Sequence, residues 1–237
     1  MNYKSKIELV ENLIREITSN CISDDINDIR NVTNYSLYLN TENFLFGLIQ
    51  SEQFFELTTF KKQIHNEFEQ VDVDNRKFTY EGFLKNAFFI TFFVTVESHI
   101  RHIAKYFEKN KDDINVKSIK TTFKNITKSD KTPHFSSLEK KDIELFNFYC
   151  YLRNTMHEIG FQSESNPNQS LIIEDLDSVI TKNRTELKLN SGSENKIDLK
   201  ELLLIQEQIF KLLNKINKLI PKEKFIKHKL VDVGFNG

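Results

Sequence analysis

The chain has 237 residues with 39% hydrophobic and 28% charged residues, and its 33 basic and 34 acidic residues leave a net charge of −1. This composition excludes a disordered chain, and six glycines with three prolines exclude collagen-like and proline-rich classes. So few turn-forming residues also argue against an all-β fold and favour long helices, while the balanced charge argues against a wholly basic nucleic-acid-binding protein.

The first residues predict one amphipathic helix and then a polar stretch. Residues 5–20 place Ile7, Val10, Leu13 and Ile17 at helical spacing. Residues 21–40 are rich in Asn and Asp, so we expect a loop with a short helix. A second helix is expected from Thr41, which would cap it, and a third segment surrounds residue 60.

Residues 71–77 (VDVDNRK) interrupt this pattern and mark the expected boundary between two units. Residues 1–75 hold 13 acidic and 6 basic residues, whereas the remainder holds 21 acidic and 27 basic residues. The asymmetry predicts an acidic N-terminal helical annex at 1–75 and a mildly basic helical bundle at 76–237. Oppositely charged faces of one body explain it equally well.

The second unit predicts a central helix followed by smaller elements. Thr79 is expected to cap a helix that runs to about residue 110, with apolar side chains all round its first half. Helices are expected at 116–131 and 138–159, the latter followed by Gly160. Residues 171–189 alternate and predict a small β-hairpin with its turn near 182 and 183. Asp198 should cap a last long helix that Pro221 stops.

Neither a membrane segment nor a secreted chain is expected. The most apolar run, residues 87–96, is half of the roughly 20 residues that a membrane helix needs. The charged N-terminus does not resemble a signal peptide, and Cys21 and Cys150 fit neither a metal pair nor a disulfide framework. We therefore expect a reducing, cytoplasmic setting and no membrane contact.

Lysines recur along the helix expected at 116–131 with steps of three and four, which align them on one stripe. The stripe consists of Lys117, Lys120, Lys124, Lys128 and Lys131. Such a row can follow a phosphate backbone, so the first four are candidate nucleic-acid-binding residues. An ordinary solvated helix face is the alternative, and the position of the stripe relative to the next motif decides between them.

The sequence YLRNTMHEIG at 151–160 carries the most informative chemistry. Arg153 and His157 are four apart on an expected helix, so both project from one face. An arginine holds a phosphate with a planar fork, and a histidine exchanges protons near neutral pH. Together they suffice for RNA cleavage without metal or cofactor, in which the 2′-hydroxyl is the nucleophile. Asn154 can orient its neighbour. By spacing alone, a surface pair near a helix C-terminus explains the motif as well.

A histidine pair earlier in the chain is a weaker candidate. His99 and His102, with Glu97, could share a metal ion, but zinc sites need further ligands. Exposed polar positions on the amphipathic half of the central helix are the simpler interpretation. The predicted site therefore contains no metal.

The motif Arg153-Asn154-x-x-His157 before Gly160 resembles the HEPN superfamily of helical bundles, as does the segment FVTVESHIR at 93–101. The resemblance covers about residues 78–220. It implies an all-α fold, dimerisation, and in many members metal-independent endoribonuclease activity in toxin–antitoxin or phage-defence systems. Arg153 would then face the phosphate, His157 would transfer protons, and Glu97 would orient Arg153.

The resemblance also implies partners: RNA, a second copy that completes the site in a homodimer, and a cognate inhibitor protein. The chain departs from the usual pattern because three residues rather than four to six separate Arg153 from His157. Each residue changes the helical phase by about 100°, so the departure affects catalysis more than fold. Two rivals stay open: a non-catalytic HEPN-like binding or dimerisation module, and a neutralising protein that docks through the acidic N-terminal unit.

Overall fold

The computed structural model of the chain describes residues 1–20, 25–64, 68–107, 117–128, 135, 137–157, 167–221 and 223–227, and for His157 only the backbone. Within these residues the fold is a helical bundle with one two-stranded sheet. The elements are α1 (Tyr3–Thr18), α2 (Ile29–Phe54), α3 (Leu57–Gln63), α4 (Gln70–Phe107), α5 (Ile119–Lys128), α6 (Lys140–His157), β1 (Gln169–Ile173), β2 (Thr185–Leu189) and α7 (Leu199–Leu219). The expected all-α class with a small hairpin is confirmed.

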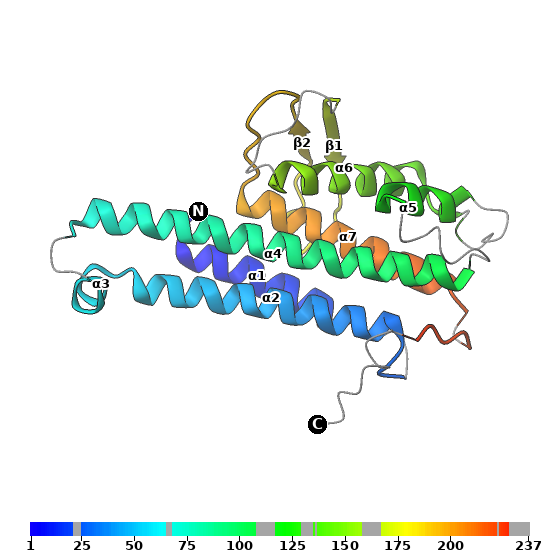
Figure 1. Ribbon diagram of the computed structural model, residues 1–237, viewed down its shortest axis with the longest axis horizontal. Helices are drawn as coiled ribbons and strands as arrows, with labels where there is room; N and C mark the ends of the chain where they lie inside the picture. Colours follow the sequence, from blue (N-terminus) through cyan, green and yellow to red (C-terminus); the bar gives the residue numbers. More distant parts are fainter. Residues whose placement is uncertain are drawn as a thin grey trace.

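Four long helices form the main layer of the molecule (Figure 1). Helix α1 packs on α2 and α7, and α4 packs on α2 and α7. Helices α5 and α6 pack on one half of α4, and the hairpin lies against α6. The other half of α4, together with the end of α2 that leads into the short α3, extends past the rest of the bundle as an arm. The α5–α6 layer therefore covers only one end of the central helix.

Phenylalanine fills much of the core, as the composition suggested. Phe89, Phe92, Phe146 and Phe210 are at most 1% exposed. The apolar interior is one continuous cluster that includes Val10 of α1 as well as residues of α7. Burial of large aromatic side chains supplies most of the free energy that holds such layers together.

Two helices begin earlier than expected, and both errors have the same cause. Helix α2 starts at Ile29 with Asp28 as its cap, and Thr41 lies inside it. Thr79 likewise lies inside α4. The hydroxyl of Thr41 donates to the carbonyl of Leu37 at 2.8 Å, and that of Thr79 donates to the carbonyl four residues earlier at 2.9 Å. A threonine whose hydroxyl bonds the preceding turn tolerates a helix interior.

The expected break at 71–77 is not seen, because α4 runs through it without interruption. The segment contains no glycine or proline, its charged side chains are solvated, and Val73 is fully buried. The boundary predicted at 75 and 76 thus falls inside one helix. Buried side chains of α1 and α2 belong to the same hydrophobic core cluster as those of α4, α5, α6 and α7.

A buried ion pair fastens the end of the described chain to the start of α2. Asp28 and Arg30 are 0% and 1% exposed, and the guanidinium donates to both carboxylate oxygens at 2.8 and 2.7 Å. Arg30 also donates to the carbonyl of Lys224 at 2.9 Å, and the amide of Ile29 donates to the carbonyl of Ile226 at 2.8 Å. These bonds satisfy the donors at the α2 N-terminus.

The hairpin forms at the expected strands but with a different connection. Strand β1 pairs antiparallel with β2 so that Leu171 lies opposite Leu187. The turn expected near 182 and 183 is wrong, because residues 174–184 form a long connection. Within it, Ser178 and the amide of Val179 donate to the buried carboxylate of Glu207 at 2.5 and 2.8 Å. This connection therefore follows α7 instead of pairing as a strand.

The last helix matches its prediction. Asp198 caps α7 by accepting from the amide of Glu201 at 2.8 Å, and the Glu201 side chain accepts from the amide of Asp198 at 2.9 Å. This reciprocal capping box is a strong helix start. Of the helices in the described part of the chain, none combines the length and apolar character that a membrane crossing requires.

Candidate nucleic-acid interface

Helix α5 presents the predicted lysine stripe on its outer face. Ile119, Phe123 and Ile126 are buried, whereas Lys124 and Lys128 are exposed and Lys120 is half-buried. Residues 119–128 contain no acidic side chain. Lys117 lies just before the helix and is half-buried, and the predicted member at residue 131 lies outside the described residues. The stripe is thus a solvent-facing row of positive charge.

An aromatic contact and a lysine hold α5 against α6. The rings of Phe123 and Phe146 stack with centroids 4.0 Å apart. On the outer side, the Nζ of Lys120 donates to the Tyr151 hydroxyl at 2.9 Å and lies 4.2 Å from its ring centroid. Lys120 of the lysine stripe therefore contacts Tyr151, the first residue of the α6 motif.

Arg153 lies two residues further along α6, at the border of the core. It is half-buried, and its guanidinium lies 5.8 Å from the ring centroid of Phe93. Its Nη1 donates to the Asn154 Oδ1 at 3.3 Å. Asn154 thus contacts Arg153 as the sequence suggested, and a cation–π contact with an aromatic ring leaves guanidinium N–H groups for other acceptors.

The thiol of Cys150 shows that both cations share one neighbourhood. Burial raises the pKa of Cys150 to about 12, while the positive charges of Lys120 and Arg153 act against this rise. Cys150 lies one turn before Arg153 on α6 and is 8% exposed. A thiol with this pKa stays protonated and is no nucleophile near neutral pH. The two cations therefore flank a buried, unreactive group.

Glu97 does not orient Arg153 as expected. Its Oε1 accepts from Nε and Nη2 of Arg101 at 2.8 and 2.6 Å, one turn along α4. Arg101 also donates to the carbonyl of Lys117 at 3.2 Å and so ties α4 to the start of α5. The expected supporting role of Glu97 is corrected: it positions Arg101, because an i,i+4 partner on its own helix is nearer.

His157 is the last described residue of α6, and its side chain lies outside the described part. Its backbone follows Arg153 by four helical residues, which corresponds to about 6 Å along the axis on the same face. The backbone spacing that the motif required is thus present. The role of the imidazole stays a prediction.

The histidines of α4 do not form the metal site considered from the sequence. His99 is fully buried, with Nδ1 2.9 Å from the Thr33 hydroxyl and Nε2 2.9 Å from the Asn217 Oδ1. Its expected exposure is wrong, because α2 and α7 cover that face of α4. His102 Nδ1 instead lies 2.7 Å from the Ser98 carbonyl. No group of three potential metal ligands occurs among the residues described.

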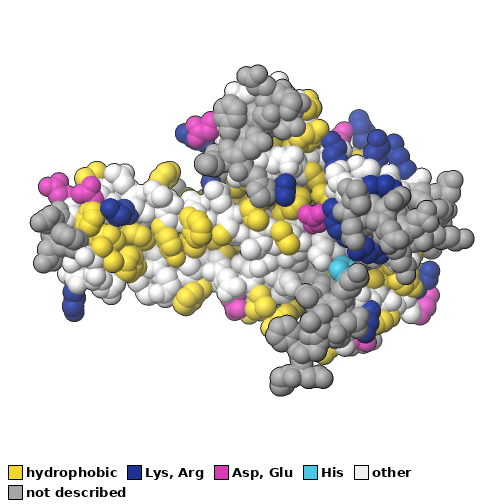
Figure 2. Space-filling view, in the orientation of Figure 1, with side chains coloured by type: hydrophobic (Ala, Val, Ile, Leu, Met, Phe, Trp, Pro, Cys, Tyr) yellow, Lys and Arg dark blue, Asp and Glu magenta, His cyan; other side chains and the backbone are white. Residues whose placement is uncertain are grey.

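Lysine and arginine side chains gather over α5 at one end of the molecule (Figure 2). The cationic surface, as we define it, consists of Lys120, Lys124 and Lys128 of α5 with Arg153 of α6. Its members come from two helices that pack directly against each other. Closely spaced cations that face solvent repel one another and favour a polyanionic ligand.

Comparison of the chain with protein-family models, with curated proteins and with solved structures finds no match. The relation to the HEPN superfamily therefore stays a prediction from the motif.

Proposed function

We propose that the protein binds RNA on the cationic surface and cleaves it as a metal-independent endoribonuclease of the HEPN type. The observation that supports this most directly is the contact between Lys120 and Tyr151. Tyr151 lies two residues before Arg153 on α6, and the charges of Lys120 and Arg153 both act on the Cys150 thiol, which supports a position of the lysine stripe near Arg153. A phosphate backbone that follows the stripe thereby arrives at the arginine.

The chemistry would follow from three groups. The 2′-hydroxyl of the RNA attacks the adjacent phosphorus and loses its proton to His157. The guanidinium of Arg153 stabilises the negative charge of the phosphorane. The bond from phosphorus to the 5′-oxygen then breaks, and that oxygen takes up a proton, which leaves a 2′,3′-cyclic phosphate and a 5′-hydroxyl. In a homodimer the second copy of the motif would supply the second proton-transferring imidazole.

RNA binding is tested by removing charge at exposed positions whose side chains make no hydrogen bond or ion pair within the described residues. Lys124→Gln with Lys128→Gln should weaken the binding of a single-stranded RNA, and each lost phosphate contact should reduce the slope of log K against log salt by about 0.7. Lys182→Gln with Lys188→Gln is the matched control, since both lysines are also solvent-exposed but belong to β2 and the connection before it. Equal losses in the variant and the control would contradict an RNA site on α5.

Cleavage is tested separately with Arg153→Lys and His157→Ala. Arg153→Lys keeps the charge but loses the planar fork, so we expect cleavage to fall at least tenfold while RNA binding changes little. His157→Ala should abolish cleavage without lowering thermal stability. Purified chain that binds RNA on α5 but never cleaves it would favour the non-catalytic binding module.

One contact argues against the alternative of a non-catalytic HEPN-like binding module. A structural ion pair between Arg153 and Glu97 would have tied the arginine into the scaffold. Glu97 instead bonds Arg101. Within the described residues, Arg153 makes a cation–π contact with Phe93 and one long hydrogen bond to the Asn154 side chain, which leaves it able to meet a ligand.

A further inference from the structure

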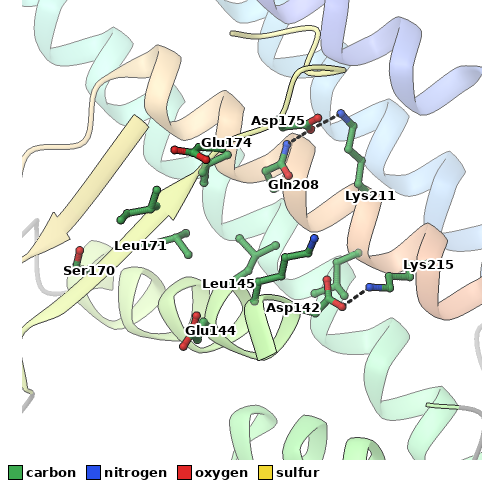
Figure 3. Close-up of a pocket in the computed structure, with 14 residues that line it drawn as sticks. Asp142, Glu144, Leu145, Ser170, Leu171, Glu174, Asp175, Gln208, Lys211 and Lys215 are labelled. Carbon is green, nitrogen blue, oxygen red and sulfur yellow. Dashed lines mark hydrogen bonds and ion pairs between the residues drawn. The ribbon is translucent and has the colours of Figure 1, made fainter. Parts of the chain in front are cut away.

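A groove with a cavity volume of about 540 Å³ lies on the hairpin side of the molecule, between β1, the start of α6 and the middle of α7. Figure 3 shows residues of β1 on one wall and residues of α6 and α7 on the others. Its apolar part includes Leu145 of α6, Leu171 of β1 and Leu212 of α7. This site is separate from the cationic surface, which belongs to α5 and the end of α6.

The groove follows the edge of β1 that β2 does not occupy. All residues from 170 to 175 line it, both the buried Leu171 and Ile173 and the exposed Ser170 and Ile172. Successive side chains of a strand point to opposite faces of the sheet. A space lined by successive residues therefore runs along the edge of the strand and not across one face. The wall of the groove is therefore the backbone of β1 itself.

The backbone groups on this edge have no partner in the described part of the chain. An antiparallel ladder directs only alternate N–H and C=O pairs of a strand toward its neighbour. Apart from the pairing with β2, no described element makes a hydrogen bond to the backbone of residues 170–174. Several donors and acceptors of β1 thus point into the groove.

Strand β1 lacks the residue types that usually prevent a strand edge from pairing with another chain. Strands at the edges of sheets normally carry charges or proline, which prevent pairing with other chains. Strand β1 reads QSLII, without either, and its Ile172 is 49% exposed. Leu176, just beyond the strand, is 79% exposed. In contrast, the exposed positions of β2 are the charged Glu186 and Lys188.

The charges of the groove favour a positively charged occupant. Lys211 Nζ lies 2.7 Å from Asp175 and 2.9 Å from Glu207, and Lys215 Nζ lies 2.5 Å from Asp142 and 3.5 Å from Glu139. The third lysine of the groove, Lys141, pairs with Glu139 at 3.0 Å. Each ammonium group of the groove therefore already has a carboxylate partner. An anion would have to displace that partner.

The carboxylates at the mouth are more available. Glu144 and Glu174 line the groove with side chains 55% and 63% exposed. Their partners are Lys140 at 3.4 Å and Arg184 at 2.7 Å, both well exposed, and surface pairs of this kind are worth at most about 1 kcal/mol. A cation carried by a ligand can replace them at little cost.

We propose that this groove binds an extended peptide segment of a partner protein, which adds to β1 as a third strand. The peptide backbone pairs with the free edge, alternate apolar side chains pack on Leu145, Leu171 and Leu212, and lysine or arginine side chains meet Glu144 and Glu174. Strand addition gains affinity from the main chain and selectivity from alternate side chains. The proposal concerns a surface that the proposed RNA cleavage does not use.

The test uses a fluorescein-labelled synthetic peptide of alternating valine and lysine and the full chain, followed by fluorescence anisotropy. We expect saturable binding that falls at least about tenfold, or 1.4 kcal/mol, when glutamate replaces lysine in the peptide or when its backbone amides are N-methylated. Hydrogen exchange should show new protection of the amides in residues 170–174. Arg153→Ala should leave peptide binding unchanged, which separates this site from the RNA site.

Ile172→Lys on the edge should reduce binding at least about tenfold, whereas Glu186→Lys, directly opposite on β2, adds more positive charge without touching that edge and should not. The N-methylated peptide on the unaltered chain decides the matter even if Ile172→Lys misfolds. Equal binding of the N-methylated peptide, or no binding of any peptide, overturns the proposal. So does a dimer of the unaltered chain in sedimentation that Ile172→Lys dissociates, because a second copy would then occupy the edge.

Discussion

The buried histidine of α4 makes the stability of the protein depend on pH in a way that one substitution can isolate. His99 is fully buried between α2 and α7. Asn217 Oδ1 can only accept, so Nε2 of the ring donates to it and Nδ1 is left to accept from the Thr33 hydroxyl. The neutral ring is therefore satisfied on both sides. Replacing it by glutamine removes the titration while keeping an amide donor and acceptor.

The magnitude follows from the pKa. Burial lowers the pKa of His99 from 6.5 to about 4, with a smaller contribution from the charge of His102. The hydrogen bonds to Asn217 and to the Ile29 backbone and the charge of Asp28 act against this fall. Because the folded pKa lies below the unfolded one, the unfolded chain binds the extra proton first. Stability from this residue is therefore complete above about pH 6.5 and is lost as the pH falls toward 4. Each pKa unit corresponds to 1.36 kcal/mol, so the loss between pH 7 and 4.5 is about 2 kcal/mol.

Urea unfolding at pH 7 and pH 4.5 measures this loss. We expect His99→Gln to be less stable than the unaltered chain at pH 7 by about 1–3 kcal/mol, because its bonds fit less well, and the gap should close by about 2 kcal/mol at pH 4.5. A gap for His99→Gln that is the same at both pH values would refute a buried neutral ring.

Three further predictions concern stability. Asp28→Asn keeps a helix cap but leaves the buried Arg30 charge unpaired, so it should cost about 3–5 kcal/mol in urea unfolding, and adding Arg30→Met should recover part of that loss. Asp198→Ala should cost about 1 kcal/mol by removing one half of the capping box of α7, a loss that Asp198→Asn should mostly avoid. Gly82→Ala should raise stability by up to about 1 kcal/mol, since nothing lies within 4 Å of an added Cβ in this helix, whereas Gly47→Ala should gain less because its Cβ would lie 3.0 Å from Leu84. Thermal unfolding that gives Gly47→Ala the larger gain would contradict the close packing of α2 on α4.

Local signals in the sequence predicted the elements whose ends depend on local bonds. The start of α7 was predictable because Asp198 and Glu201 make the capping box within three residues. The face of α5 was predictable because lysines and apolar residues repeat with the helical period. Thr41 and Thr79 misled for the same local reason: a hydroxyl that can cap a helix can also bond the turn before it.

The remaining errors concern contacts between residues that are distant in sequence. The residues next to His99 in the sequence do not predict its contacts with Thr33 and Asn217. Those next to Val179 do not predict its hydrogen bond to the Glu207 carboxylate. The pair of Glu97 and Arg101 is the exception. Its i,i+4 spacing was visible in the sequence and predicts the observed bond better than the resemblance did.

The attachment of residues 224–227 to the start of α2 bears on how the protein is made. During synthesis, Arg30 leaves the ribosome almost two hundred residues before the carbonyl of Lys224 that it bonds. Helix α1 likewise cannot complete its packing until α7, against which it lies in the folded bundle, has been synthesised. The first two helices of the nascent chain therefore stay incompletely packed until translation is nearly over. Translation that stopped before Leu199 would yield a product that lacks α7 and has an exposed core.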